Sequence, residues 1–198
     1  AAGNWNTVQI GSPDASATFT HAIVRYGGNT SCCGKPQANV YNAGGWLNIS
    51  DSEIATSTTY GINHESGTST VTSADIHHQS YGVSYTGSGS LTVSSSTLRN
   101  HTSYGVSRVG TSGTLTLTGN VFTDNYTGAV LLTSGAGSST FTSAGNSASG
   151  QPNSLNGYVV TGVPPQETWP QRDLPYIISG TVTMEANKKL TLGEGTII

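Results

Sequence analysis

Short runs in which apolar and polar residues alternate recur along most of the chain at a nearly constant interval. The apolar positions that define these runs are Leu47 and Ile49, Val71, Leu91 and Val93, Leu115 and Leu117, and Phe141. From Ile49 through Val71, Val93 and Leu117 to Phe141, the spacings are 22, 22, 24 and 24 positions. The residues between them are mostly Ser, Thr or Asn, which gives the two-residue period of a β-strand with one buried face. The pattern predicts short strands that end near residues 49, 71, 93, 117 and 141.

Two further series advance in step with the first. Ile54, Ile76, Leu98 and Phe122 are spaced by 22, 22 and 24 positions. The dipeptide Tyr-Gly recurs at Tyr60, Tyr81 and Tyr104, each time followed by Ile or Val, and a weaker fourth copy has Tyr126, Gly128 and Val130. Three series with one period indicate a structural repeat of 22–24 residues.

Each repeat holds about three short strands separated by Gly, Asn and Ser turns, and none can bury its apolar face alone. Stacking the repeats solves this problem, because each strand then pairs in parallel with its equivalent in the next coil. The predicted fold is an all-β, right-handed parallel β-helix (a β-solenoid) with about 22–24 residues per coil. An antiparallel β-sandwich is the alternative, but it does not require equal spacings, and the hairpin signal Asn-Gly occurs only at Asn156-Gly157.

Several stretches carry a family resemblance. ATFTHAIVRYGG (17–28), the repeated YGI or YGV, and SLTVSSSTLRNHTSYGV (90–106) resemble the right-handed parallel β-helix repeat family of secreted and cell-surface proteins, a pectate-lyase-like superfold. PYIISGTVTMEANKKLTLGEGTII (175–198) is similar to the segment that opens such helices, where it normally precedes the coils. The resemblance implies an extracellular or cell-surface location. It leaves the activity open, because the family includes adhesins, surface-layer components, carbohydrate-binding modules and lyase-like enzymes.

Three regions are expected along the chain. Residues 1–150 form the coils, with a loop inserted at 27–37, because Ala17, Phe19 and Val24 match the later repeats at a spacing of 30. Residues 151–173 contain four prolines and read as a linker or cap. Residues 174–198 read as the start of a further β-helix segment, or as a strand region that contacts another subunit. Its apolar residues are the expected assembly contacts: Ile177, Val182, Leu190, Leu192, Ile197 and Ile198.

Charge and composition exclude several partners. Only 9% of the residues are charged and the net charge is −3. No basic surface is available to neutralise a run of phosphates, so nucleic acid is excluded as a partner. No segment approaches the ~20 apolar residues of a membrane span. The surface is expected to consist of hydroxyl and amide groups rather than ions.

The strongest candidate for chemistry is a cluster of charged residues on successive coils. Glu53 and Asp75 occupy equivalent positions, and His77, His78 and Arg99 lie just beyond them on neighbouring turn positions. Two stacked carboxylates beside a histidine and an arginine are suited to binding Ca²⁺ or to protonating a glycosidic oxygen. The alternative is a solvated face whose charges compensate one another. The column of carboxylates stops at two, because Thr97 and Val121 come next, so we predict no catalytic residue and no cofactor, with Ca²⁺ as the alternative.

Aromatic and histidine residues are further candidates for sites. Tyr60, Tyr81 and Tyr104 are expected to stack as a structural ladder, whereas Tyr41 and Tyr85 are candidates for an exposed platform that binds glycans. On the same hypothesis, Glu53, Asp75, His77 and Arg99 contribute polar contacts to the glycan. The adjacent His77 and His78 are expected to point to opposite faces of a strand, so no metal site is predicted.

Asparagine and cysteine residues are candidate sites of glycosylation and disulfide formation, respectively. The four sequons at Asn29, Asn48, Asn100 and Asn125 are glycosylation sites if the source glycosylates secreted proteins. Asn100 and Asn125 are also expected near one corner, with Gln79, as a structural amide ladder. Cys32 and Cys33 are the only cysteines, and neighbours cannot form an ordinary intrachain bridge. A vicinal disulfide, interchain disulfides and free thiols all remain open, with disulfide chemistry favoured.

These observations favour a non-catalytic structural or adhesive module of an extracellular surface protein or filament, which assembles head to tail with copies of itself or with adjacent β-helix domains. The alternatives are a module that binds polysaccharide, and a polysaccharide lyase or glycoside hydrolase. An ice-binding role would need a wide, flat array of threonines. Thr70, Thr92, Thr116 and Thr140 are expected to form a column only one residue wide, which gives that role little support.

Overall fold

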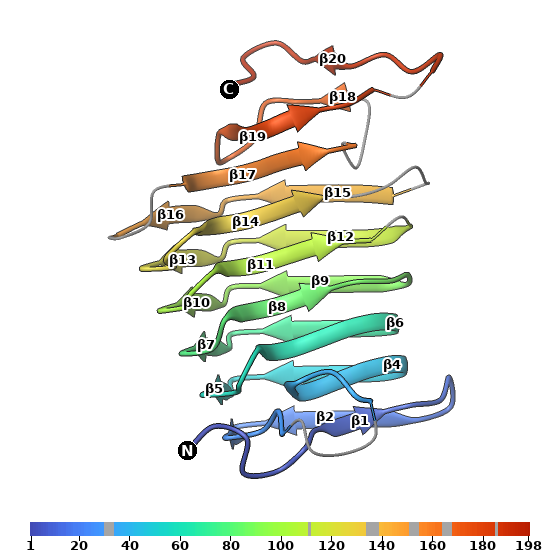
Figure 1. Ribbon diagram of the computed structural model, residues 1–198, viewed down its shortest axis with the longest axis vertical. Helices are drawn as coiled ribbons and strands as arrows, with labels where there is room; N and C mark the ends of the chain where they lie inside the picture. The colour runs from blue at the N-terminus through green and yellow to red at the C-terminus, as the bar shows by residue number, and fades with distance from the viewer. Residues whose placement is uncertain (30–33, 111, 134–138, 151–154, 164–167, 185) are drawn as a thin grey trace.

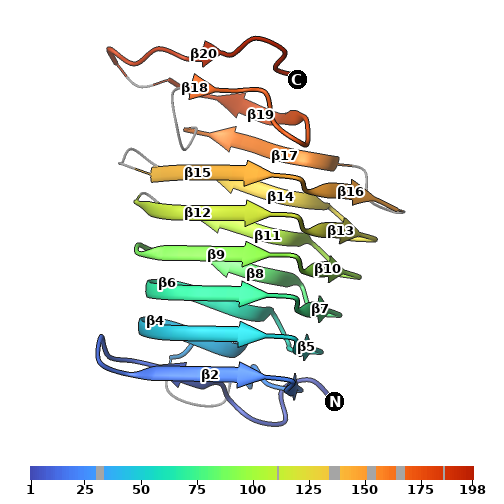
Figure 2. The same ribbon diagram turned by 180° about the vertical axis from the view of Figure 1, so that it is seen from behind.

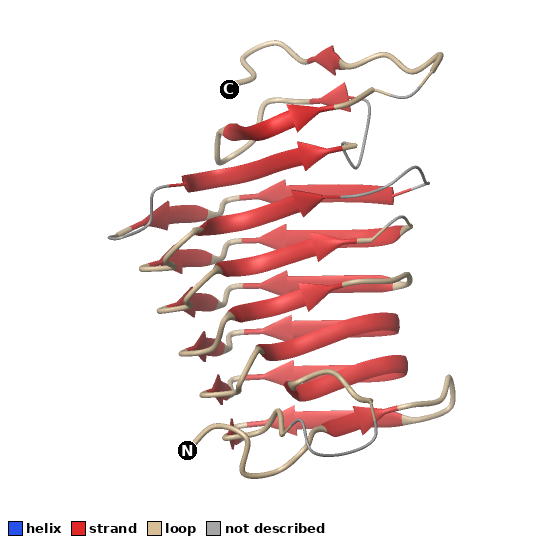
Figure 3. Cartoon of the chain, in the orientation of Figure 1, coloured by secondary structure: helices blue, strands red, loops and turns tan. Residues whose placement is uncertain are grey.

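The computed structural model is a β-solenoid whose coils are stacked along the long axis of the molecule (Figure 1). It describes residues 1–29, 34–110, 112–133, 139–150, 155–163, 168–184 and 186–198, and every regular element among them is a strand (Figure 3). The described residues include no helix with the length and hydrophobicity needed to cross a membrane.

The strands form three faces, named here A, B and C in the order in which each coil visits them. Face A contains β1 (Val8–Ile10), the first part of β4 (Ala38–Ser50), the first part of β6 (Tyr60–Thr72), β8 (Tyr81–Tyr85), β11 (Tyr104–Val109), β14 (Gly128–Thr133), β17 (Leu155–Gly162) and β19 (Tyr176–Val182). Face B contains β2 (Ser16–Thr20), the second parts of β4 and β6, β9 (Ser90–Ser94), β12 (Gly113–Thr118) and β15 (Ser139–Ala144). Face C contains β3 (Ile23–Arg25), β5 (Glu53–Ala55), β7 (Asp75–His77), β10 (Thr97–Arg99), β13 (Val121–Thr123) and β16 (Ser147–Ser149).

The parallel register confirms the predicted fold class. On face B, Ile49, Val71, Val93 and Leu117 pair in one continuous file, which Phe19 extends towards the N-terminus. On face C the equivalent file runs through Ile54, Ile76, Leu98 and Phe122. Both files are buried from residue 49 onwards and form the core between the three faces. Each coil thus buries its apolar side against its neighbours above and below, as the equal spacings required.

Two residues were placed in the wrong file by sequence spacing. Phe141 pairs with Leu115, whereas Leu117 pairs with Ser143. A shift of two positions keeps the same side chains facing inward, so the hydrophobic pattern alone cannot distinguish the two registers. Tyr104 pairs with Gly128, so Tyr126 does not continue the tyrosine ladder and is 65% exposed.

Sharp corners join the faces through single residues in the left-handed conformation. The corner between faces B and C has positive φ at His21, Asp51, Ser73, Ser95, Gly119 and Gly145. The corner between faces C and A has positive φ at Tyr26, Thr56, His78, Asn100, Asp124 and Gly150. Asn, Asp, His and Gly tolerate this conformation better than other residues, which accounts for most of the two columns. One such residue turns the chain without a long loop, and each coil therefore stays short.

A ladder of buried polar side chains lies beside the corner between faces B and C. Ser96 Oγ accepts from the Ala74 N–H, Asn120 Oδ1 from the Ser96 N–H, and Asn146 Oδ1 from the Asn120 N–H. The amides of Asn120 and Asn146 also donate to the carbonyls of Val93 and Leu117. These side chains satisfy backbone groups that the turn leaves out of the sheets.

The amide ladder expected from the sequence takes a different form. Asn125 lies in one file with Gln79 and His101, and its amide donates to the Leu98 carbonyl. Asn100 belongs to the neighbouring column of left-handed residues. Both asparagines therefore lie at the corner between faces C and A, but they do not stack on each other.

A second buried polar file runs along face A where the chain turns towards face B. Its members are Asn42, His64, Tyr85 and Arg108, all fully buried. Asn42 Nδ2 donates to the Gly45 carbonyl and Tyr85 Oη to the Gly89 carbonyl. Arg108 donates to the carbonyls of Thr140, Ser112 and Gly113. The long side chains thus satisfy carbonyl groups at this corner from inside the core.

The coils continue beyond residue 150. β17 lies within the segment expected to be a linker or cap, yet it pairs with β14, and β19 pairs with β17. The remaining strands, β18 (Thr168–Trp169) and β20 (Thr191–Leu192), form a separate parallel pair. Trp169 stacks on Tyr176 with ring centroids 4.8 Å apart, and Tyr158 packs edge-on against Phe141. Aromatic rings therefore fill this end of the core.

The threonine column on the outward side of face B differs from the one expected from the sequence. Thr70, Thr92 and Thr116 do form a file, but its next member is Thr142 rather than Thr140. Hydroxyl residues also occupy parallel columns on both sides of this file. The array is therefore three residues wide, not one.

Buried histidines make the stability of the fold depend on pH. Burial lowers the pKa of His64 to about 4 and that of His101 to about 3, from 6.5. Below pH 6.5 the unfolded chain binds more protons than the folded chain, so the free energy of unfolding falls as the pH drops towards 4. Each histidine contributes a slope of up to about 1.4 kcal/mol per pH unit in this window, and none above pH 7.5.

Chemical unfolding at pH 7.5, 6, 5 and 4.5 measures this slope. The variant His64→Gln removes the contribution of His64, so its slope should be smaller than that of the parent chain by up to about 1.4 kcal/mol per pH unit. A stability that stays constant between pH 6.5 and 4.5 would contradict the prediction.

Candidate functional site

Face C carries a charge ladder, defined as Arg25, Glu53, Asp75, His77 and Arg99. Glu53 and Asp75 are cross-strand partners on β5 and β7, as the sequence predicts. The Arg25 guanidinium donates to both Glu53 oxygens at 2.6 and 2.7 Å. The Arg99 guanidinium donates to both Asp75 oxygens at 2.9 and 2.6 Å. Each carboxylate is therefore held by a two-pronged contact, the strongest geometry for this pair of groups.

His77 lies between the two pairs. Its Nε2 is 3.2 Å from Glu53 Oε1 and 3.8 Å from Asp75 Oδ2. Its Nδ1 is 2.6 Å from Nδ1 of His78, and the two rings meet edge to face. The expectation that these histidines point to opposite faces was wrong, because His78 follows β7 in the left-handed conformation and its ring returns towards His77.

The electrostatics of the ladder do not suit acid catalysis. Hydrogen bonds from Arg25 lower the pKa of Glu53, and burial lowers the pKa of His77. A glycosidase acid needs a carboxyl group whose pKa is raised, so that it carries a proton at working pH. Glu53 has the opposite property. With His77 neutral, its Nε2–H can donate to Glu53 while Nδ1 accepts from His78, which leaves no proton poised for transfer.

The same contacts limit metal binding. Both Arg–carboxylate pairs occupy the oxygens that a Ca²⁺ ion would need. In the part of the chain that the structure describes, no three His, Cys, Asp or Glu side chains converge in the way a metal ion requires. The ladder instead links β3, β5, β7 and β10 across successive coils.

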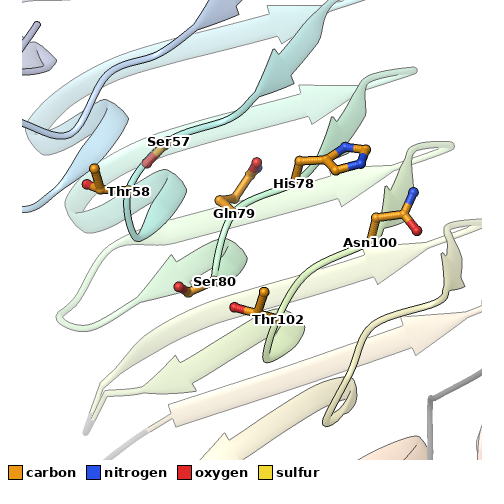
Figure 4. Close-up of a pocket in the computed structure, with 7 residues that line it drawn as sticks. All are labelled: Ser57, Thr58, His78, Gln79, Ser80, Asn100 and Thr102. Atoms are coloured by element: carbon orange, nitrogen blue, oxygen red, sulfur yellow. The ribbon is translucent and has the colours of Figure 1, made fainter. Parts of the chain in front are cut away.

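A shallow hollow of about 250 Å³ adjoins the ladder at the corner between faces C and A (Figure 4). Its lining carries hydroxyl, amide and imidazole groups and no charged carboxylate: Ser57, Thr58, His78, Gln79, Ser80, Asn100 and Thr102. His78 and Asn100 reach it from equivalent left-handed positions on adjacent coils. Such a surface can form hydrogen bonds with a neutral polar ligand.

The predicted tyrosine platform does not exist. Tyr85 is fully buried and donates to the Gly89 carbonyl, and Tyr41 is 7% exposed with its hydroxyl bonded to Glu65. They also lie in different files, because Tyr41 pairs with Asn63 whereas Tyr85 pairs with His64. Neither ring can stack on a sugar. The structural ladder of Tyr60, Tyr81 and Tyr104 is present, with centroids 5.5 and 6.5 Å apart.

The other predicted positions lie apart from the ladder. Asn48 is exposed, Asn29 and Asn100 are partly buried, and Asn125 is fully buried, so its side chain is inaccessible to glycosylation in the folded chain. Cys32 and Cys33 lie outside the described residues. Of the expected assembly contacts, Leu192, Ile197 and Ile198 are exposed, while Ile177, Val182 and Leu190 are partly buried.

Sequence reasoning missed Arg25 as a member of this site, and it did not predict that the His78 ring packs against His77. Arg25, Ala55, His77 and Arg99 occupy equivalent positions on β3, β5, β7 and β10. Counting the repeat back from Arg99 across the inserted loop would have placed Arg25 in the column. No periodicity indicates that His78 folds back, because that follows from the corner conformation.

Comparison with known proteins supports the fold. A family model described as a right-handed beta helix region matches residues 8–162, from β1 to the end of β17. No curated protein and no solved structure matches the chain. The match identifies an architecture that serves several unrelated functions, so the function must be argued from the surface.

Proposed function

Because the chain belongs to the family of right-handed β-helix regions, we propose that it is a non-catalytic structural or adhesive module of an extracellular surface protein or filament. The observation that carries this proposal is the state of the charge ladder. Its two carboxylates are each bound by an arginine, and Glu53 has a lowered pKa. The carboxylates best suited to acid–base chemistry therefore already form ion pairs with arginines of neighbouring coils.

The proposal includes assembly of such modules end to end. The last described rung, which contains β20 (Figure 1), supports it because its apolar side chains Leu192, Ile197 and Ile198 are exposed. Exposed apolar groups of this size favour contact with a further coil, whether it comes from the same polypeptide or from another copy.

Binding of a neutral glycan is the second candidate function. The hollow beside the ladder supports it, because its hydroxyl and amide groups match the hydrogen-bonding capacity of sugar hydroxyls. The hollow lacks an exposed aromatic ring, so binding there would rest on hydrogen bonds.

One set of measurements separates these functions. The purified chain and its Glu53→Gln variant are incubated with neutral and acidic polysaccharides, and release of reducing or unsaturated sugars is followed. We expect no release by either protein above a protein-free control. Release by the parent that Glu53→Gln abolishes would assign an enzyme, and retention of a polysaccharide without release would favour the glycan-binding module. Light scattering tests assembly between copies, because a mass that stays that of one chain at every concentration would contradict association of separate copies.

A further inference from the structure

The outward side of face B is a regular grid of hydroxyl groups. Six strands lie in register there, in the order β2, β4, β6, β9, β12 and β15, and Figure 2 shows them stacked as a nearly straight file of arrows. Each strand presents three alternate residues to solvent, and none of these side chains is buried. The rows are Ser16, Thr18 and Thr20; Trp46, Asn48 and Ser50; Thr68, Thr70 and Thr72; Ser90, Thr92 and Ser94; Thr114, Thr116 and Thr118; Thr140, Thr142 and Ala144.

The composition of this grid is unusual for a protein surface. It contains no charged side chain, and the four rows from β6 to β15 consist of Thr and Ser except for Ala144. An average soluble domain has about a quarter of its residues charged. The face therefore offers no positive charge to neutralise nucleic acid, an acidic polysaccharide or an anionic membrane, and it favours an electrically neutral partner.

The spacing of the grid is set by the backbone. Neighbouring strands are about 4.8 Å apart, and alternate residues on one strand are about 6.6 Å apart. Threonine is stiff at χ1, so its hydroxyl and methyl groups hold these positions with little loss of entropy on binding. In addition, Thr72 Oγ1 lies 3.1 Å from Ser94 Oγ, within hydrogen-bond distance. This contact further restrains two hydroxyl groups of one column. A rigid array that repeats in two directions fits a partner that also repeats in two directions.

We propose that face B binds the surface of ice. Each hydroxyl can both donate and accept a hydrogen bond, as each water molecule of an ice lattice does. The methyl groups between the hydroxyls are apolar, so covering them with the ice surface removes them from liquid water and lowers the free energy of the complex. A crystalline polysaccharide is the competing neutral partner, but sugar rings bind best on aromatic side chains, and the grid has a single one, Trp46, on its second row.

This inference does not depend on the proposed function. The charge ladder and the hollow lie on face C and at its corner with face A, whereas the grid lies on face B. Failure of the polysaccharide assays and failure of ice binding are therefore separate results.

Slow growth of ice from a solution of the purified chain tests the proposal, with the fraction of protein taken into the ice as the readout. We expect the parent chain to be enriched in the ice over serum albumin. Thr92→Tyr, at the centre of the grid, should lower the incorporated fraction by about tenfold, because a bulky ring separates the two surfaces. The matched control is Thr123→Tyr on face C, which should behave like the parent.

Circular dichroism verifies that each variant is folded, and Thr118→Tyr at the exposed rim of the grid replaces Thr92→Tyr if that variant is not. Three results would overturn the proposal. The parent chain could partition like albumin, Thr123→Tyr could reduce incorporation as strongly as the grid variants, or the chain could bind microcrystalline cellulose or chitin through face B and show no enrichment in ice.

Discussion

Replacing Phe122 by alanine is expected to lower the free energy of unfolding by about 3–5 kcal/mol. Phe122 is fully buried in the file between Leu98 and Ala148 on face C. Its ring packs directly on the backbone of face A, since a Cβ added at Gly105 would lie 2.6 Å from Phe122 Cδ1. Hydrogen bonds between coils fix β13 between β10 and β16, and short corners hold the three faces in place, so the surroundings cannot readily collapse into the space that the ring leaves.

Chemical unfolding of the variant measures this loss. Val121→Ala is the matched control, because Val121 lies next to Phe122 on β13 but points to solvent, 42% exposed. The control should change stability by no more than about 0.5 kcal/mol. If Phe122→Ala cost less than about 1 kcal/mol, the core would be more compliant than the stacked files imply.

The files of apolar residues could be predicted because a solenoid repeats them. Ile54, Ile76, Leu98 and Phe122 face one interior, so the same physical requirement recurs with the same spacing. The prediction failed for Phe141 because residues two apart on a strand share a face, and the shift from Leu117 to Leu115 changes no side chain from inside to outside.

The corners could not be predicted from hydrophobicity, since they depend on backbone conformation. Ser73, Ser95 and Thr56 adopt positive φ, although hydroxyl residues are not marked as turn formers of this kind. Asn120 is a similar case, because an asparagine surrounded by Gly and Val looks like a surface turn in the sequence. Its amide is instead fully buried and donates to the Val93 carbonyl of the preceding coil.

The candidate site, like the fold, could be predicted from the sequence only in part. The stacking of Glu53 on Asp75 followed from the repeat, and so did the proximity of His77 and Arg99. The expectation that Tyr85 is exposed was wrong. Tyr85 lies two residues after the buried Val83 on β8 and therefore points inward, where its hydroxyl donates to the Gly89 carbonyl and needs no contact with solvent. The width of the threonine grid was missed because, from β6 to β15, only the central column keeps threonine in every coil.

Replacing Arg108 by alanine is expected to lower the free energy of unfolding by about 3–5 kcal/mol. Its guanidinium is fully buried and lies 5.0 Å from the centre of the Tyr85 ring. No carboxylate among the described residues forms an ion pair with it, and it donates instead to the carbonyls of Thr140, Ser112 and Gly113. Alanine leaves three carbonyls without this donor and opens a cavity between faces A and B, so two separate costs combine.

Arg99→Ala is the matched control for Arg108→Ala, because it removes the same side chain from the surface. Arg99 is about one-third exposed and pairs with Asp75 on face C, where solvent screens the interaction, so the loss there should be about 1 kcal/mol or less. Arg108→Met separates the two costs, since methionine fills much of the volume but donates no hydrogen bond. Its stability should lie between those of the parent and Arg108→Ala. Equal losses for Arg99→Ala and Arg108→Ala would mean that the buried arginine does not hold the corner between faces A and B.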